Sequence, residues 1–282
     1  MPRVAVNDIH LNVEQAGAGP PLLLLHGFTG SAASWETHIE QFGQAFTIYA
    51  VDIIGHGRSD SPADPARYRM ERAVDDLTTL LDILEITSTA LLGYSMGGRV
   101  ALHLAVAAPE RIRTLVLESA SPGIVDPTER AARIRADEAL AESIERDGLE
   151  AFIDRWQSLP LFASQQRLPL EIRQRHRAQR LANDPVGLAN SLRGMGAGAM
   201  EPVWDRLDEM TRPVLLLAGE LDRKYVEIAE TMAQRIPGAR QLIIADAGHA
   251  THLDAPERFI PAVQDWLTDP DNGNDDDSTH PA

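Results

Sequence analysis

Ser95, Asp222 and His249 are the residues whose types and positions could carry out nucleophilic or general-base chemistry. Ser95 is the centre of a Gly-x-Ser-x-Gly sequence between an apolar run at residues 89–92 and a helical pattern at residues 97–108. That context predicts a strained strand-to-helix turn that exposes the hydroxyl above a sheet. Asp222 and His249 each follow a further apolar run. An imidazole can take the serine proton while a carboxylate fixes its tautomer and stabilises its charge, so we predict these three residues as a catalytic triad.

Other residues compete for the acid and base roles. Asp246 is the rival acid, but we expect it inside the strand next to His249, so its reach to the imidazole is poor. His26 and His56 lie in glycine-flanked loops, which we expect them to organise by hydrogen bonding. His103 lies on the helix after the serine and is expected to pack there, whereas His252 stays a competitor for the base role.

Two backbone amides are predicted to stabilise negative charge on a substrate oxygen. One belongs to Phe28, in the loop after the apolar run at residues 22–25, and the other to Met96, directly after the serine. Two such donors aimed at developing charge are worth roughly 3 kcal/mol each in other enzymes. The segment at residues 51–60 is interpreted as a loop organiser and is given no chemistry.

Composition and charge narrow the class of protein. With 282 residues and 44% hydrophobic content, the chain can bury one large core or a core with an inserted subdomain. Its net charge of -16 argues against nucleic acid or an anionic membrane as a partner. No apolar run approaches a membrane span, and the first residues lack the apolar stretch of a signal peptide, so we expect a cytoplasmic protein without membrane insertion. The absence of cysteine excludes disulfides, thiolate metal sites and a cysteine nucleophile.

Short apolar runs alternate with longer amphipathic ones, which predicts an α/β fold with a mostly parallel eight-stranded sheet flanked by helices. The alternation stops between residues 121 and 207, where the pattern is helical only. We therefore expect core segments at residues 1–120 and 208–268, a helical cap at 121–207 over the carboxyl edge of the sheet, and an acidic disordered tail at 269–282. The predicted strands are residues 4–6, 9–15, 21–26, 46–52, 90–94, 114–118, 214–218 and 241–245.

Taken together, these motifs resemble the α/β-hydrolase superfamily, in which the triad follows the same chain order of Ser, Asp and His. Four segments resemble more narrowly the 2-succinyl-6-hydroxy-2,4-cyclohexadiene-1-carboxylate (SHCHC) synthase family of menaquinone biosynthesis. Several of them lie in the predicted cap, where relatives with other substrates diverge. The resemblance runs from His26 to Phe259 and is carried by residues 91–99, 117–123, 160–165 and 190–196.

The resemblance implies a lyase that acts on 2-succinyl-5-enolpyruvyl-6-hydroxy-3-cyclohexene-1-carboxylate (SEPHCHC). Such an enzyme abstracts a proton and eliminates pyruvate without water, metal or organic cofactor. Ser95 would act as a base assisted by His249 and Asp222, in place of forming an acyl-enzyme. The two backbone amides would stabilise the charge on the succinyl carbonyl oxygen. The sequence of the triad does not distinguish this role from ester hydrolysis.

The implied substrate carries three carboxylates, which arginine binds well through its bidentate guanidinium. By resemblance, the substrate-binding residues are Tyr94, Arg99, Arg133, Trp156 and Arg180. Each has a plainer interpretation, because most surface arginines face solvent and the tryptophan could belong to the core of the cap. A basic stretch at residues 171–180 favours the binding role, since a trianion needs relief from the field of an acidic protein.

Two other functions fit the same motifs. A carboxyl-ester or lactone hydrolase would form an acyl-enzyme on Ser95 in a less cationic pocket. A hormone receptor of this fold would keep the triad and bind a ligand without turnover. The expected partner is a small-molecule polycarboxylate substrate, and we expect a monomer or small homo-oligomer that binds no nucleic acid.

Overall fold

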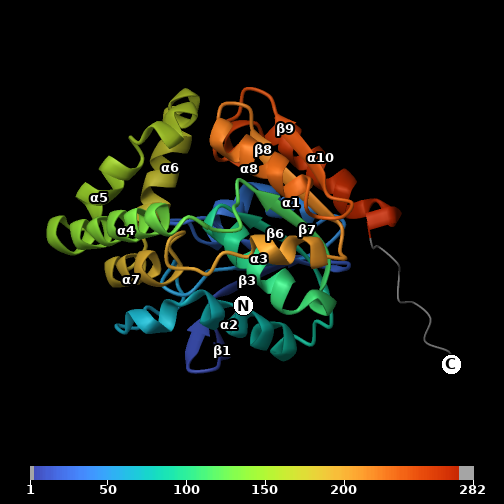
Figure 1. Cartoon of the computed structure of the whole chain (residues 1–282), viewed down its shortest axis with the longest axis horizontal. Helices are drawn as coiled ribbons and strands as arrows, with labels where there is room; N and C mark the ends of the chain where they lie inside the picture. Colours follow the sequence, from blue (N-terminus) through green and yellow to red (C-terminus); the bar gives the residue numbers. More distant parts are fainter. Residues whose placement is uncertain (1–2, 273–282) are drawn as a thin grey trace.

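The computed structural model describes residues 3–272 and contains a central seven-stranded sheet (Figure 1). The strand order is β3-β5-β4-β6-β7-β8-β9, and every neighbouring pair is parallel except β3 and β5. This mostly parallel sheet confirms the predicted α/β class. The strands are β3 (Val13–Gly17), β4 (Pro21–Leu25), β5 (Thr47–Val51), β6 (Thr89–Tyr94), β7 (Ile112–Glu118), β8 (Val214–Gly219) and β9 (Arg240–Ile244).

The central strands are apolar on both faces. The four leucines of β4, residues 22–25, are all fully buried, as are most side chains of β6 and β8. Continuous apolar runs of this kind are typical of parallel strands covered by helices on both sides. Because β4, β6, β7 and β8 run in one direction, their carboxyl ends share one edge of the sheet, where open α/β sheets bind ligands.

The sheet has one strand fewer than predicted, because the run at residues 9–15 breaks at Asn12. The Asn12 backbone N–H donates to Ser59 Oγ at 2.8 Å, and its side-chain amide donates to Asp52 Oδ2 at 2.9 Å. These bonds divert the N–H and the side chain of Asn12, whose carbonyl oxygen still accepts the Asp52 N–H at 3.0 Å. Residues before it form a separate antiparallel hairpin of β1 (Val4–Val6) and β2 (Ile9–Leu11), and those after it form β3.

Helices cover both faces of the sheet, with one apolar core on each side. On one face the core includes side chains of α2 (Met70–Ile83), α3 (Met96–Ala107) and α8 (Arg223–Ala233). On the other face it includes α1 (Glu36–Phe42) and α10 (Pro256–Thr268). The short α9 (Thr251–Asp254) precedes α10.

A helical segment lies between β7 and β8, as predicted from the loss of strand patterns. It gathers at one side of the molecule, at the left in Figure 1. Residues 119–213 are all described and none of them forms a strand. The helices pack around their own cluster of apolar side chains, which includes Ile144, Phe152 and Leu188. They are α4 (Pro127–Asp147), α5 (Leu149–Trp156), the 3-10 helix η4 (Pro160–Arg167), α6 (Leu170–Leu181) and α7 (Pro185–Met195).

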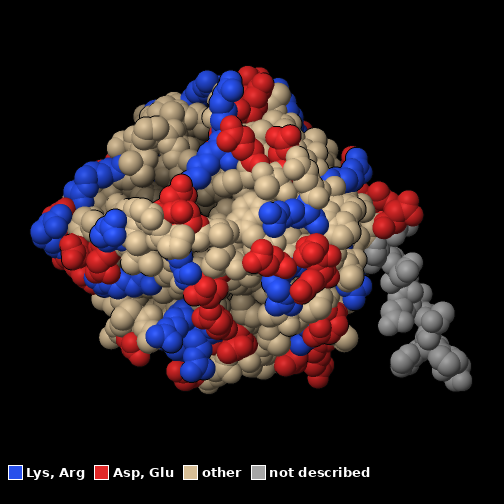
Figure 2. All heavy atoms as spheres, viewed as in Figure 1, with Lys and Arg blue, Asp and Glu red and all other residues tan. Residues whose placement is uncertain are grey.

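The end of the chain departs in part from the expected disorder. Pro270–Asn272 form a short 3-10 helix, whereas residues 273–282 of the predicted tail lie outside the described residues. None of the helices within residues 3–272 is long and apolar enough to cross a bilayer. Acidic and basic side chains are interspersed on the face drawn in Figure 2.

Candidate active site

Ser95 occupies the sharp turn between β6 and α3. Its backbone has φ 52° and ψ -107°, a conformation that costs energy for a residue with a side chain. The turn is tight because glycine lets the helix approach the sheet: a Cβ on Gly97 would lie 2.4 Å from the carbonyl oxygen of Leu25. The predicted strand-to-helix turn is therefore present, with the serine at its apex.

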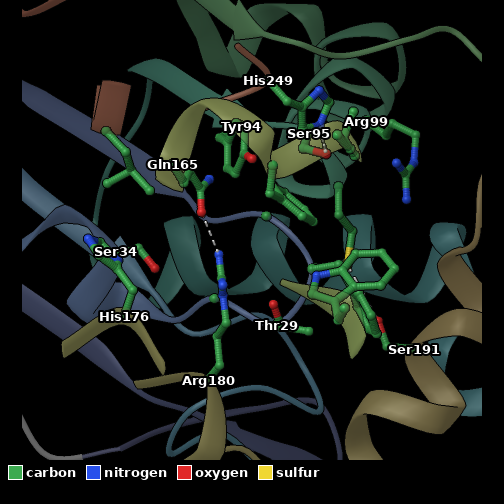
Figure 3. Close-up of a pocket in the computed structure, with 18 of the residues that line it drawn as sticks. Thr29, Ser34, Tyr94, Ser95, Arg99, Gln165, His176, Arg180, Ser191 and His249 are labelled. Atoms are coloured by element: carbon green, nitrogen blue, oxygen red, sulfur yellow. Dashed lines mark hydrogen bonds between the residues drawn. The ribbon is translucent and has the colours of Figure 1, made fainter. Parts of the chain in front are cut away.

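The structure brings the three predicted triad residues within hydrogen-bond distance of one another, and Figure 3 shows His249 beside Ser95. His249 Nε2 lies 2.9 Å from Ser95 Oγ, and His249 Nδ1 lies 2.6 Å from Asp222 Oδ2. Asp222 comes shortly after β8 and immediately before α8, and His249 follows β9. The rival acid Asp246 is exposed and faces Arg258 at 3.9 Å. The geometry thus pairs the imidazole with Asp222.

Among the described residues, none of the competing histidines pairs with Ser95, whose partner is His249. His26 Nε2 accepts from the Ile53 N–H at 3.0 Å, and its Nδ1 lies 2.8 Å from the Gly27 carbonyl oxygen, so it joins two loops as predicted. Burial lowers the pKa of His26 to about 4, which keeps this imidazole neutral. Burial also lowers the pKa of His56 to about 3 and that of His103 to about 4.

Asp52 organises the loop at residues 51–60, as predicted. Its buried carboxylate accepts the Arg58 N–H at 2.8 Å and the Asn12 amide at 2.9 Å. The bend also needs Gly57, which has φ 55° and whose Cβ would overlap this carboxylate.

The backbone amides of Phe28 and Met96 are free to bind a ligand. Met96 is the first residue of α3, so its N–H has no partner inside the helix. Within residues 3–272 no acceptor is paired with either N–H. Both residues line the cavity that contains Ser95. Both N–H groups are thus available in the cavity that contains Ser95, and their role as oxyanion donors stays a prediction.

All five predicted substrate-binding residues line this cavity. Arg99 is only 7% exposed, and the one side-chain hydrogen bond that it makes among the described residues runs from Nη2 to the Met195 carbonyl oxygen at 3.1 Å. Its Nε is buried without a partner, and burial lowers the pKa of this guanidinium. The plainer interpretation, a solvated helix arginine, is therefore wrong for Arg99.

The other two arginines enter the cavity from the helical segment. Arg133 on α4 donates to Asp137 Oδ1 at 2.8 Å. Arg180 on α6 donates to the neutral Gln165 at 3.2 Å and lies over the Phe162 ring, 5.5 Å from its centroid. Burial lowers the pKa of Arg180. Among the described residues no carboxylate pairs with Arg99 or Arg180, so the cavity carries uncompensated positive charge.

Tyr94 and Trp156 form aromatic parts of the cavity wall. The Tyr94 ring lies 5.5 Å from the His249 ring, and burial raises the pKa of its phenol well above the usual value. Trp156 packs edge-on against Phe28, with ring centroids 5.2 Å apart. Its buried Nε1 has no hydrogen-bond partner among the described residues, so Trp156 combines cap packing with a free donor.

Several lining residues were not predicted from the sequence. The Tyr225 ring lies 4.7 Å from the His249 ring, and burial raises the pKa of its hydroxyl. Gln165, His176 and Ser34 also line the cavity. Lys224, the residue before Tyr225, is exposed and does not line it. In the part of the chain that the structure describes, no cluster of three or more His, Asp or Glu side chains is arranged to hold a metal ion.

Comparison with known proteins places the chain in a family. The model of the alpha/beta hydrolase fold matches residues 20–256. A Bacillus subtilis (strain 168) protein with the provisional name SHCHC synthase is 43% identical over 266 residues, which cover 94% of this chain and 95% of that protein. The SHCHC synthase of Salmonella paratyphi C (strain RKS4594) is 33% identical over 90% of this chain and 95% of that protein.

Two solved structures resemble this chain over most of its length. MenH from S. aureus has a TM-score of 0.88 and 37% identity, covering 93% of this chain and 99% of that chain. A thermophilic esterase from Thermogutta terrifontis, with malate bound, has a TM-score of 0.83 and 29% identity, covering 95% of this chain and 98% of that chain. The resemblance drawn from the sequence segments is confirmed, together with the expectation of a lyase on this scaffold. The chain belongs to the α/β-hydrolase family and, within it, to the SHCHC synthase family.

Proposed function

We propose that this protein eliminates pyruvate from SEPHCHC to give SHCHC, a step of menaquinone biosynthesis. The observation that carries the proposal is the charge of the cavity beside Ser95. Arg99, Arg133 and Arg180 line it, and only Arg133 has a carboxylate partner among the described residues. Buried cations without counter-charges favour an anionic ligand, and the substrate brings three carboxylates.

The change in bonding defines what the triad has to do. The ring double bond at carbon 3 of the substrate becomes two double bonds, at carbons 2 and 4, so a proton leaves carbon 2 and the enolpyruvyl oxygen leaves carbon 5. Ser95 Oγ accepts the proton from carbon 2. At the same time Ser95 transfers its hydroxyl proton to His249 Nε2, which lies 2.9 Å away. Asp222 stabilises the imidazolium through its bond to Nδ1. The enolpyruvate gains one proton to become pyruvate, so atoms balance without water.

Charge moves onto the succinyl carbonyl oxygen when carbon 2 loses its proton. The N–H groups of Phe28 and Met96 face this oxygen and stabilise its negative charge, at roughly 3 kcal/mol each. The arginines hold the carboxylates and thereby orient carbon 2 toward Ser95. Restricting the substrate in this way lowers the entropic part of the barrier.

A carboxyl-ester or lactone hydrolase is the alternative. The same geometry allows Ser95 to attack a carbonyl carbon, and the T. terrifontis esterase has the same fold. The cationic lining argues against a neutral ester, because binding one would leave Arg99 and Arg180 desolvated and unpaired.

Pyruvate release from freshly generated SEPHCHC tests the proposal. We expect release well above the spontaneous rate and a loss of roughly a thousandfold or more in kcat for Ser95→Ala, because the variant lacks the base. A reaction without protein measures the spontaneous elimination. A rate equal to that background, with turnover of a p-nitrophenyl ester that requires Ser95, would assign the site to hydrolysis instead.

A further inference from the structure

A second cavity adjoins the one that contains Ser95. Its walls come from α5, η4 and α6, and we call it the outer cavity. The two cavities share Gln165, His176 and Arg180. Figure 3 shows Arg180 reaching toward Gln165. These side chains therefore form the partition between the reaction cavity and the outer cavity. The outer cavity is also lined by Asp154, Gln166, Arg173 and Arg177.

The outer cavity contains an arginine without a counter-charge. Arg173 Nη1 donates to the neutral Gln166 side chain at 3.0 Å, and its Nε is buried without an acceptor. No carboxylate among the described residues pairs with it. The nearby Arg177 differs, since Asp154 and Glu150 hold it at 2.7 and 2.9 Å. A buried guanidinium N–H that lacks an acceptor indicates that Arg173 can take a carboxylate ligand.

The partition itself can open for a carboxylate. Arg180 is held by one hydrogen bond to an amide oxygen and by its position over the Phe162 ring. A carboxylate binds guanidinium more strongly than an amide oxygen does, because the hydrogen bond is then between two charged groups. An anion that reaches Arg180 from either cavity therefore displaces Gln165.

We propose that the outer cavity is a second carboxylate-binding site on the path between solvent and the reaction cavity. Arg173 anchors the anion there, and Arg180 passes it through the partition. The ligand is an organic carboxylate, either the substrate on its way in or pyruvate on its way out. Only this choice of ligand rests on the proposed function.

Two variants on α6 separate this site from general electrostatics. Arg173→Gln removes one of the positive charges that line the outer cavity. Arg175→Gln removes the same charge from the same helix, at an exposed residue that lines neither cavity. Because the overall charge changes equally, any difference between the variants reports the position of Arg173.

The first measurement needs no turnover. In protein labelled with ¹⁵N-arginine, the Arg173 Nε–H resonance, assigned by its loss in Arg173→Gln, is followed during titration with pyruvate or succinate. We expect a saturable shift for Arg173 and none for Arg175. A linear drift of both resonances, or no shift of Arg173, overturns the site even if the protein turns over SEPHCHC.

The second measurement identifies the ligand. If the substrate uses the site, Arg173→Gln lowers kcat/KM for SEPHCHC roughly fivefold to tenfold at low ionic strength, because the steering charge is lost. If pyruvate uses it, the same variant raises the product-inhibition constant of pyruvate by a similar factor. Arg175→Gln changes neither quantity. If both kcat/KM and the product-inhibition constant are unchanged in Arg173→Gln, the proposed path is overturned. If the protein does not turn over SEPHCHC at all, the proposed function is refuted, and the titration alone decides whether the site exists.

Discussion

Glu118 connects the serine turn to the histidine loop. Its carbonyl oxygen accepts the Ser95 N–H at 2.8 Å. Its carboxylate, fully buried, accepts the Thr251 hydroxyl at 2.7 Å and pairs with His252 Nδ1 at 2.8 Å. Burial by itself would raise the pKa of Glu118, but the His252 ring and these hydrogen bonds hold the pKa below its usual value. The backbone of Glu118 therefore holds the serine turn, and its carboxylate holds the segment after His249, so this residue fixes the two parts of the site relative to each other.

Replacing this buried carboxylate is expected to lower the free energy of unfolding more than replacing a surface carboxylate does. Glu118→Gln keeps the shape but removes the charge that His252 faces, so the free energy of unfolding should fall by about 3 kcal/mol. Urea denaturation at neutral pH measures the change. Glu110→Gln, at an exposed position, is the control and should change the same quantity by less than about 0.5 kcal/mol. Equal stability of the two variants would contradict the anchoring role.

At this scale the sequence predicts the reactive residues better than the cavity wall. Ser95 is recognisable because a local motif and its flanking elements define the turn, and His249 because it follows an apolar run. Tyr225 and Gln165 carry no such signal. Each lies on a helix whose orientation depends on tertiary packing, and only that packing turns its side chain toward Ser95.

At the scale of elements, two glycines have different tasks. Gly97 allows α3 to touch β4 behind the serine. Gly148 separates α4 from α5 with φ 82° and ψ 161°, and a Cβ there would meet no atom within 4 Å. The first glycine is required by close contact and the second by backbone conformation.

The two glycine-to-alanine variants should therefore fail differently. Gly148→Ala is expected to lower the free energy of unfolding by about 2 kcal/mol through backbone strain, with kcat unchanged. Gly97→Ala should lower it by about 3 kcal/mol through steric overlap and also reduce kcat, because the displaced helix carries the Met96 amide. Thermal unfolding together with a turnover assay checks both. A Gly97→Ala protein with normal kcat would contradict the contact.

Most elements are predictable because their causes are local. The continuous apolar runs of β4 and β8 predict buried parallel strands, and both are present. The break at Asn12 is different, since it depends on hydrogen bonds to Ser59 and Asp52. These residues lie 47 and 40 positions further along the chain. A pattern of neighbouring residues contains no information about such distant partners.

At the scale of the whole molecule, buried histidines make stability depend on pH. Burial lowers the pKa of His26, His38, His103 and His176 to about 4, and that of His56 to about 3. In the unfolded chain these imidazoles titrate near 6.5. Between pH 6.5 and about 4 the unfolded chain therefore binds more protons than the folded one, so acidification through this window favours unfolding.

His103 offers a test of this dependence, because it lies on α3 outside the site and its buried Nε2 has no partner among the described residues. His103→Leu removes one imidazole that must stay neutral in the fold. Between pH 8 and pH 5, each such imidazole lowers the free energy of unfolding by about 2 kcal/mol. The loss of stability over this interval should therefore be about 2 kcal/mol smaller in the variant than in the parent chain. Urea denaturation at both pH values measures the two losses. Any packing change caused by leucine acts equally at pH 8 and pH 5 and cancels from the comparison. Equal losses in the two proteins would mean that His103 takes up a proton in the folded state. In that case His103 would not be a source of the acid sensitivity.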